Sequence, residues 1–268
     1  MTTPLVTVAI CTFNGEAYLE KTLRSVIAQT CSDFEIVVVD DGSTDGTVAL
    51  IERFAREQAR IRPFFRANHG LAASRNFAFA QARGAWIAII DQDDLCYPTR
   101  LERQLEIAQQ HPTAGLVFCN THYINEADEV IGEHMSGFKL PERFIPKGLA
   151  ANLLLQQGCF IDSESCFINR ETVQALGGLD ETLRYACDYE YFVRAGLEVD
   201  FAYSGEILAA WRIHANQATK RDSRKFIEMY QVYRSFVLAR RLTLRTRASL
   251  LVSLGKSLTL HFLNRIRA

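Results

Sequence analysis

Residues 86–94 read WIAIIDQDD, five apolar or aromatic residues followed by four polar ones. A short run of this kind predicts a strand buried on both faces, because helices cover both sides of a parallel sheet. Residues 5–12 (LVTVAICT) and 35–40 (EIVVVD) repeat the pattern, and each is followed by a turn and then by apolar residues at helical spacing. Strands that alternate with helices in this way predict an α/β fold with a largely parallel central sheet flanked by helices.

The alternation extends over the first 120 residues and then breaks down. Residues 121–165 mix polar residues with glycines and prolines, which predicts flexible loops. After them, the sequence predicts a strand, a short helix, a Gly-Gly turn and an amphipathic helix that begins near Asp188. In the first part, further strands are expected at 62–66 and 116–120, and helices at 19–27, 48–54, 71–83 and from about residue 98.

The composition is typical of a folded globular protein, but the charge is unevenly distributed. Hydrophobic residues make up 48% of the 268 residues and charged residues 23%, which excludes intrinsic disorder for most of the chain. The formal net charge is −1. Residues 215–268 contain 12 Lys and Arg and 2 Asp and Glu, a balance of +10, so residues 1–214 carry −11. This asymmetry predicts a domain at 1–214 and a basic, helical C-terminal extension at 215–268.

The cysteines and the N-terminus indicate the cellular compartment. Seven cysteines without a CxxC pair argue against a disulfide framework or a zinc ribbon and favour a reducing cytoplasm. No basic segment precedes the first apolar run, so no secretory signal is expected. No run approaches the roughly 20 apolar residues that span a bilayer. We therefore expect a cytoplasmic protein, either soluble or peripheral on the inner face of the cytoplasmic membrane.

Polar residues follow three of the expected strands. They are Asn14 after the first strand, Asp40 and Asp41 at the end of the second, and 91–94 at the end of the strand that begins at Trp86. Ligands of parallel α/β sheets bind at the carboxyl ends of the strands. Three polar strand ends on one edge therefore predict a binding site. The DDGSTD turn that begins at Asp40 is equally compatible with an ordinary turn that caps the next helix.

The DQDD sequence at 91–94 has carboxylates suited to a metal ion. Asp91 and Asp93 project to the same side of an extended chain, because side chains alternate along a strand. Mg²⁺ and Mn²⁺ prefer carboxylate oxygens, waters and substrate phosphates. The alternative is an acidic turn that caps the helix beginning near Pro98. The position directly after a buried strand, on the same edge as the carboxylates of the second strand, favours the metal site.

Six segments in order form a pattern that is more specific than any one of them. They are VTVAICTFNGEAYLEKTLRSVIAQT (6–30), EIVVVDDGSTDGT (35–47), NHGLAASRN (68–76), WIAIIDQDD (86–94), GGLDETLRYACDYEYFVR (177–194) and WRIHANQAT (211–219). This set resembles the inverting GT-A glycosyltransferases of family 2, a group that includes many bacterial polysaccharide transferases. The resemblance implies a GT-A catalytic domain at 1–214, with a nucleotide-sugar part at about 1–120 and an acceptor part at about 121–214.

The resemblance also implies roles for single residues. The general base would be Asp188, the Asp of a Glu-Asp pair that opens a helix in relatives; here Cys187 precedes it instead of Glu. Arg75 is equally compatible with an ordinary ion pair to the acidic edge, and His214 with a structural role. The nucleotide would contact Thr12, Asn14, Asp40, Asp41, Arg75 and Asp91, and the metal ion would bind Asp93, Asp91 and His214.

These roles imply a metal-dependent transfer of a sugar with inversion. The donor would be a nucleotide sugar, a UDP-sugar, and the acceptor a hydroxyl of a sugar or of a lipid-linked saccharide, with Mn²⁺ or Mg²⁺ as cofactor. A carboxylate on the acceptor side must take the proton of the attacking hydroxyl, because this is a single in-line displacement. A cation must neutralise the charge that develops on the leaving diphosphate.

Several other functions are compatible with parts of the sequence. A nucleotidyltransferase is the nearest alternative enzyme, although the first strand is not followed by a glycine-rich, basic loop. A phospho-acceptor signalling domain would leave most of the chain without a role. A catalytically inactive nucleotide-sugar-binding module is a further alternative because of Cys187. The chain has no GxGxxG, P-loop or GxSxG motif, which argues against dinucleotide enzymes, P-loop NTPases and α/β hydrolases.

The basic extension combines positive charge with an apolar helical face. A pair of helices that packs on the catalytic domain or on a second subunit is one interpretation, and attachment to an anionic membrane is another. Nucleic acid is not expected as a partner, because the acidic first part would repel phosphates. The charged residues include Lys220, Arg221, Arg224, Lys225, Arg234, Arg245 and Arg247, and the apolar face Leu251, Leu254, Leu258 and Phe262.

Overall fold

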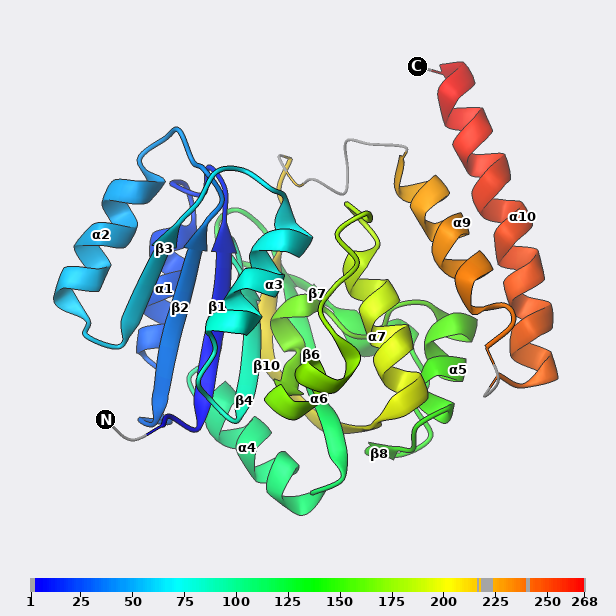
Figure 1. Ribbon diagram of the computed structural model, residues 1–268, viewed down its shortest axis with the longest axis horizontal. Helices are drawn as coiled ribbons and strands as arrows, with labels where there is room; N and C mark the ends of the chain where they lie inside the picture. The colour runs from blue at the N-terminus through cyan, green and yellow to red at the C-terminus, as the bar shows by residue number, and fades with distance from the viewer. Residues whose placement is uncertain (1–2, 216, 218–223, 240–241, 268) are drawn as a thin grey trace.

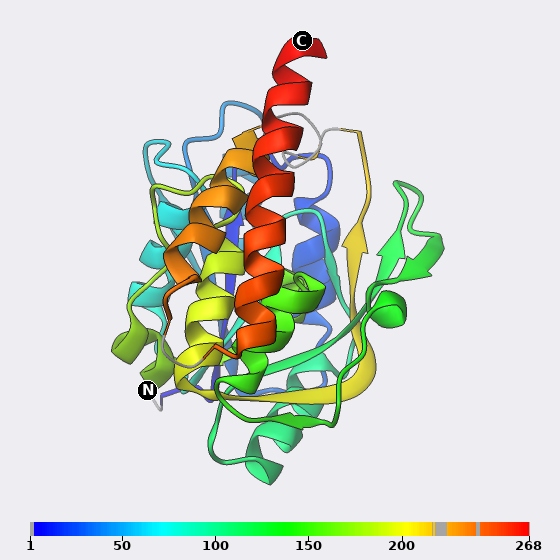
Figure 2. The same ribbon diagram turned by 90° about the vertical axis from the view of Figure 1, so that its right-hand side faces the viewer.

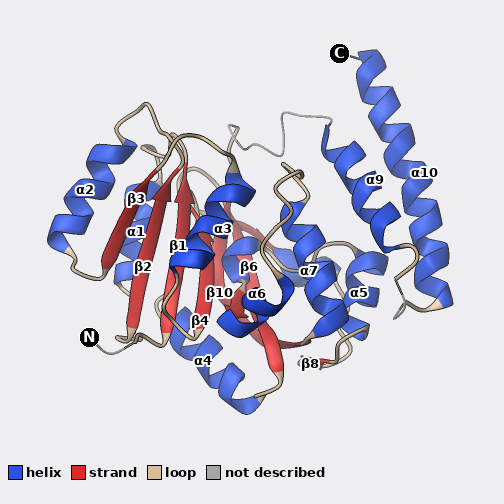
Figure 3. Cartoon of the chain, viewed as in Figure 1, coloured by secondary structure: helices blue, strands red, loops and turns tan. Residues whose placement is uncertain are grey.

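The protein is built around one central sheet with helices on both faces (Figures 1 and 3). The computed structural model describes residues 3–215, 217, 224–239 and 242–267, with the helical backbone alone at 258 and 261–267. Within these residues the sheet has ten strands, eight of them in the order β3-β2-β1-β4-β9-β6-β10-β5. The expected α/β architecture, with helices flanking the sheet and following it at the C-terminus, is confirmed.

The first half of the sheet is parallel and brings the polar strand ends together. It consists of β1 (Val6–Thr12), β2 (Phe34–Asp40), β3 (Ile61–Phe65) and β4 (Trp86–Asp91). In this register Thr12 pairs with Asp40, and Cys11 pairs with Asp91. The carboxyl ends of three strands therefore lie side by side at one edge, as the sequence predicts.

Helices bury these strands on both faces. Val8 and Ile10 of β1 belong to a core that also contains residues of α1 (Leu19–Ile27), α2 (Thr47–Glu57) and α4 (Arg100–Gln110). The intervening Ala9 and Cys11 belong to a second core with α3 (Leu71–Gln81) on the opposite face. Residues of β1 belong alternately to the first and to the second core, because successive side chains of a strand point to opposite faces. The all-apolar strand sequences follow from this double burial.

The second half of the sheet is mixed. Strand β6 (Ala114–Ile124) pairs in parallel with β10 (Asp200–Arg212), and β9 (Phe167–Asn169) lies antiparallel between β4 and β6. Helix α6 (Arg170–Leu176) follows β9. Three short antiparallel strands complete the sheet: β5 (Leu95–Cys96), β7 (Val130–Glu133) and β8 (Phe144–Ile145).

The expectation of loops over 121–165 is wrong in part. This region contains the end of β6, two short strands, the 3-10 helices η1 (His134–Gly137) and η2 (Ser163–Ser165), and helix α5 (Leu149–Gln157). Helix α5 packs closely on α7 (Cys187–Glu198), where a Cβ at Gly196 would lie 2.8 Å from the backbone nitrogen of Ala151. The sequence LAANLLLQQ is apolar around most of the helix and therefore shows no amphipathic period.

The C-terminal extension forms two helices that pack on α5 and α7. Helices α9 (Arg224–Phe236) and α10 (Leu244–Arg267) lie against each other, and α10 also contacts α5 (Figures 1 and 2). The side chains of Val232, Phe236, Leu242 and Leu250 belong to the same core as residues of α7. Lys220 and Arg221 lie outside the described residues. Among the described helices, none is long and apolar enough to cross a membrane.

Candidate active site

The two loops at the ends of β1 and β2 are joined by hydrogen bonds. Asn14 has a left-handed backbone (φ 50°), and its Oδ1 accepts a hydrogen bond from the backbone nitrogen of Thr44 at 2.8 Å. The Oγ of Ser43 accepts from the backbone nitrogen of Asn14, also at 2.8 Å. Thr12 Oγ1 donates to Oε1 of Gln92 at 2.6 Å. Two of the residues expected at the nucleotide, Thr12 and Asn14, thus hold neighbouring strand ends together.

Asp40 and Asp41 have different partners. Asp41 accepts hydrogen bonds from the backbone nitrogens of His69 and Gly70, at 2.9 and 2.8 Å, and from Ser74 Oγ at 2.8 Å. Gly70, with φ 90°, occupies the N-cap position of α3, and the Asp41 carboxylate accepts the backbone N–H of this N-cap residue. Oδ2 of Asp40 accepts from two nitrogens of its own turn, whereas Oδ1 is buried and has no hydrogen-bond partner among the described residues.

A buried arginine joins the two sides of the site. Arg75 of α3 is 1% exposed and forms ion pairs with Asp91, at the end of β4, and with Asp188, in the first turn of α7. Burial alone would lower the pKa of Arg75, but the carboxylates of Asp188 and Asp91 raise it well above its ordinary value. Ser163 Oγ donates to the second oxygen of Asp188 at 3.1 Å. Arg75 therefore remains a cation between an acidic strand end and the expected base.

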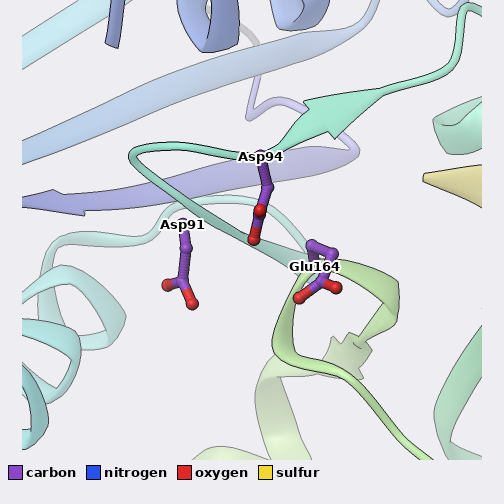
Figure 4. A group of neighbouring side chains, drawn as sticks. All are labelled: Asp91, Asp94 and Glu164. Atoms are coloured by element: carbon purple, nitrogen blue, oxygen red, sulfur yellow. The ribbon is translucent and has the colours of Figure 1, made fainter. Parts of the chain in front are cut away.

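Acidic side chains gather behind the DQDD turn. Oxygens of Asp91, Asp94 and Glu164 lie within 4.8 Å of one another, and the three side chains point toward a common region (Figure 4). Burial raises the pKa of Asp94 and of Glu164 well above the ordinary values, and the neighbouring carboxylates raise both further. Oε1 of Glu164 is buried without a hydrogen-bond partner among the described residues. An unsatisfied group of hard oxygen donors fits a divalent cation such as Mg²⁺ or Mn²⁺.

Asp93 and His214 form a pair beside this acidic group. His214 Nε2 lies 2.8 Å from Oδ2 of Asp93. The fully buried Arg212 donates from its backbone nitrogen to Asp94 Oδ1 and from Nε to the carbonyl of Asp93, both at 2.8 Å. It also forms an ion pair with Asp128 at 2.5 Å. Arg212 thereby fixes the turn that presents the carboxylates.

Sequence reasoning missed Glu164 and Arg212. Glu164 lies in η2, inside the region for which loops were expected, and no motif marks it. Arg212 belongs to the WRIH segment, where only His214 attracts attention as a titratable residue. The one available signal was the position of Arg212 two residues before that histidine. The other expected residues lie along the carboxyl edge of the sheet, apart from Arg75 and Asp188, which face that edge from α3 and α7.

A known protein family matches most of this chain. Residues 7–177 match the model of the family described as glycosyl transferase family 2. The chain belongs to glycosyltransferase family 2. The sheet described above, with acidic residues at its carboxyl edge, is therefore the fold of a member of this family.

Relatives of this family 2 chain are named as glycosyltransferases. An uncharacterized glycosyltransferase of Nostoc sp. is 35% identical over 181 residues, which are 65% of this chain and 54% of the relative. An uncharacterized glycosyltransferase of Methanocaldococcus jannaschii is 30% identical over 218 residues, or 80% of this chain and 72% of the relative. The chain thus spans about half the length of the Nostoc relative.

Solved structures share the fold of the family 2 chain. The structure of S. aureus TarS in complex with UDP-GlcNAc aligns with a TM-score of 0.69 and 18% identity, over 96% of this chain and 72% of that one. A mannosyltransferase from Pyrobaculum calidifontis, in complex with GDP-Man and Mn²⁺, aligns with a TM-score of 0.66 and 18% identity, over 97% and 74%. At these identities the likeness concerns the fold alone.

Proposed function

We propose that this protein is an inverting, divalent-metal-dependent glycosyltransferase that transfers a sugar from a nucleotide sugar, a UDP-sugar, to a hydroxyl acceptor. The observation that carries the proposal is the double ion pair of Arg75 with Asp91 and Asp188. The guanidinium of Arg75 holds the Asp91 carboxylate, at the proposed metal-binding edge, on one side and the Asp188 carboxylate on the other. A displacement with inversion needs groups on opposite sides of the anomeric carbon, which this arrangement provides.

Asp188 is the general base of the proposed reaction. One of its oxygens contacts Arg75 and the other accepts from Ser163, so the carboxylate is oriented before a substrate binds. The acceptor hydroxyl would replace or share the Ser163 contact and transfer its proton to Asp188 as the glycosidic bond forms. Cys187 points into the core, where burial raises its thiol pKa far above the ordinary value. A neutral thiol there adds no charge beside Asp188.

On the donor side, Asp91, Asp93 and His214 are the proposed ligands, with Asp94 and Glu164 in the adjoining acidic group. A bound Mn²⁺ or Mg²⁺ would act as a Lewis acid that stabilises the charge of the nucleoside diphosphate. Arg212 keeps the turn of these carboxylates in place through its bonds to Asp93 and Asp94.

The nucleotide is proposed to bind along the ends of β1 and β2. Thr12, Asn14, Asp40 and Asp41 line this edge, and Oδ1 of Asp40, which has no hydrogen-bond partner in the described part of the chain, would accept from an N–H or O–H group of the base or ribose. Arg75 and Asp91 would lie beside the diphosphate of the bound nucleotide. We therefore propose that the nucleotide-sugar part comprises about residues 1–120, the acceptor part about residues 121–214 and the helical extension residues 215–268, the division that the sequence predicts.

Hydrolysis of a panel of nucleotide sugars, with and without Mn²⁺, tests the proposal. We expect one UDP-sugar to be hydrolysed slowly to UDP and free sugar with Mn²⁺, and not after chelation with EDTA. Release of pyrophosphate from a nucleoside triphosphate and a sugar phosphate would identify a nucleotidyltransferase instead. Binding of a nucleotide sugar without turnover would indicate an inactive binding module. Equal rates with Mn²⁺ and with EDTA would exclude metal dependence.

The extension is proposed to attach the enzyme to the anionic inner surface of the cytoplasmic membrane, where a lipid-linked saccharide would be the acceptor. The exposed face of α10 carries Leu244, Leu251 and Val252, the last two 62% and 59% exposed, together with Arg245 and Lys256. Leu254 is half-buried, and the side chains of Leu258 and Phe262 are outside the part of the chain that the structure describes. Apolar and basic residues on one helix face favour an interfacial position, where each cation near the surface adds about 1 kcal/mol.

We expect the full-length protein to sediment with anionic vesicles in low salt and to be released in high salt. The double variant Leu251→Glu, Val252→Glu should lose most of this binding, because it places two carboxylates on the membrane-facing side of α10. The matched control is Val130→Glu, Ile131→Glu, which alters two equally exposed apolar residues of β7.

Equal loss of binding in both double variants, or no binding by the unaltered protein, would contradict the membrane proposal. Sedimentation equilibrium would then decide whether the same face of α10 joins two copies of the chain.

A further inference from the structure

The helix that carries Asp188 receives its N-terminal cap from the C-terminal extension. Oε2 of Glu228, in α9, accepts hydrogen bonds from the backbone nitrogens of Tyr185 and Ala186, at 2.6 and 3.0 Å. Ala186 is the N-cap residue of α7 and has no side chain able to accept such a bond. Glu228 therefore accepts the backbone N–H of the N-cap residue from another helix, as the Glu of a capping box does from within its own helix.

The carboxylate of Glu228 is held in place by the packing of α9. Glu228 is 7% exposed, although it is a charged residue. One turn further along α9, Val232 and Tyr233 follow on the same side: Val232 is in the core that contains Tyr189, and the rings of Tyr233 and Tyr189 meet edge to face at 6.1 Å. Two consecutive turns of α9 thus contact the first turn of α7 and the residues just before it.

This contact acts on the backbone that determines the position of the base. Asp188 is the second residue of α7, two positions after Ala186. The N-terminal backbone N–H groups of a helix have no partner within the helix and attract negative charge. A carboxylate at this end both fixes the first turn and favours its helical conformation. The Asp188 carboxylate itself is held by Arg75 and Ser163, from two other elements.

We propose that Glu228 is a positioning residue for Asp188, so that the C-terminal extension completes the active site. This inference rests on the proposed function, in which Asp188 is the base. Catalysis by a general base depends on its placement, and a misplacement of about 1 Å can cost about 100-fold in rate. Without Glu228, the two residues before α7 lose these hydrogen bonds, and the backbone that leads into the helix of Asp188 is held less firmly.

The test uses the full-length protein and three substitutions at one position. Glu228→Ala removes both hydrogen bonds and should lower kcat between about 10- and 100-fold, with the donor KM unchanged. Glu228→Gln should restore most of the activity, because one amide oxygen can accept both bonds. Glu228→Asp keeps the charge but is one methylene shorter, so it should lower kcat while the protein folds. Gln231→Ala, on the exposed face of the same helix, is the matched control.

Hydrogen exchange of the peptide that spans residues 183–190 gives a readout that does not depend on turnover. Exchange at Tyr185 and Ala186 should be faster in Glu228→Ala and near normal in Glu228→Gln, because local opening exposes amides whose bonds are lost. If Glu228→Ala does not fold, the comparison of Glu228→Asp with Glu228→Gln tests the same positioning role.

Two results would overturn the inference. One is a Glu228→Ala or Glu228→Asp protein with both a normal kcat and a normal melting temperature. The other is a variant whose melting temperature is lower but whose kcat, measured where the variant is folded, is unchanged, because Glu228 would then have a purely structural role. Failure of the proposed function is distinguishable, because it would show as full activity in Asp188→Asn. An inactive Asp188→Asn together with a fully active Glu228→Asp would refute only the positioning role.

Discussion

Asp188→Asn should lower kcat by about 100-fold or more. The amide has nearly the size of the carboxylate and can still accept a hydrogen bond from Ser163, but it cannot take the proton of the acceptor hydroxyl. Asn is also a good residue near a helix N-terminus, so the first turn of α7 should persist. Because Asp91 still pairs with Arg75, we expect the variant to fold with a lower melting temperature, since the buried guanidinium loses one of its two carboxylates, and to bind the nucleotide sugar with little change in affinity.

The measurement is steady-state transfer with a saturating donor, together with thermal unfolding of the same preparation. Asp180→Asn, an exposed residue in the loop before α7, is the matched control and should leave kcat unchanged. A normal kcat in Asp188→Asn would show that Asp188 serves only as an ion-pair partner of Arg75 and not as the base. It would also remove the basis for an inverting mechanism in this site.

Asp93→Asn should abolish most of the metal-dependent turnover while the fold is retained. The substitution removes one charged oxygen ligand, and the charge of the diphosphate is then less well neutralised in the transition state. We expect a loss on the order of 1,000-fold, which corresponds to about 4 kcal/mol. The fold should survive because Arg212 contacts the backbone carbonyl of residue 93, not its side chain.

Binding of Mn²⁺, followed by the electron paramagnetic resonance of the free ion, measures the same effect without turnover. Asp93→Asn should bind Mn²⁺ more weakly than the unaltered protein. Asp33→Asn, an exposed residue before β2 at the opposite edge of the sheet, should bind it normally. A near-normal rate of Asp93→Asn with either Mn²⁺ or Mg²⁺ would show that the ion is held elsewhere, for example by Asp94 and Glu164.

The sequence predicts the parallel half of the fold well because those strands are buried on both faces. A strand such as EIVVVD is apolar without interruption and is bounded by turn residues, so both its type and its ends are visible. Strand β10 gave no such signal, although it is the longest in the sheet. Its pairing with β6 shifts register between Tyr203 and Ile207, around Gly205 with φ 75°, and the bulge interrupts the alternation that would identify a strand.

The candidate site was predictable where its residues follow strands and not where they come from distant segments. Asp40, Asp41, Asp91 and Asp93 are at strand ends, and the topology of a parallel sheet places such ends at one edge. The pairing of Arg75 with two carboxylates depends on how α3 and α7 pack, which no local pattern encodes. Glu228 is one of only two acidic residues in a basic segment, and its sequence environment predicts a solvated surface position.

The cap that Glu228 provides has a consequence for how the protein is made. A chain is synthesised from its N-terminus, and the parts made first fold first. The parallel sheet and α7 are complete in sequence well before residue 228, which follows Tyr185 by 43 positions. During translation, the emerging polypeptide can therefore form the proposed nucleotide-binding edge while the helix of Asp188, the proposed base, still lacks its contact with Glu228. Competence for transfer would therefore follow only after residue 228 and the rest of α9 have emerged from the ribosome.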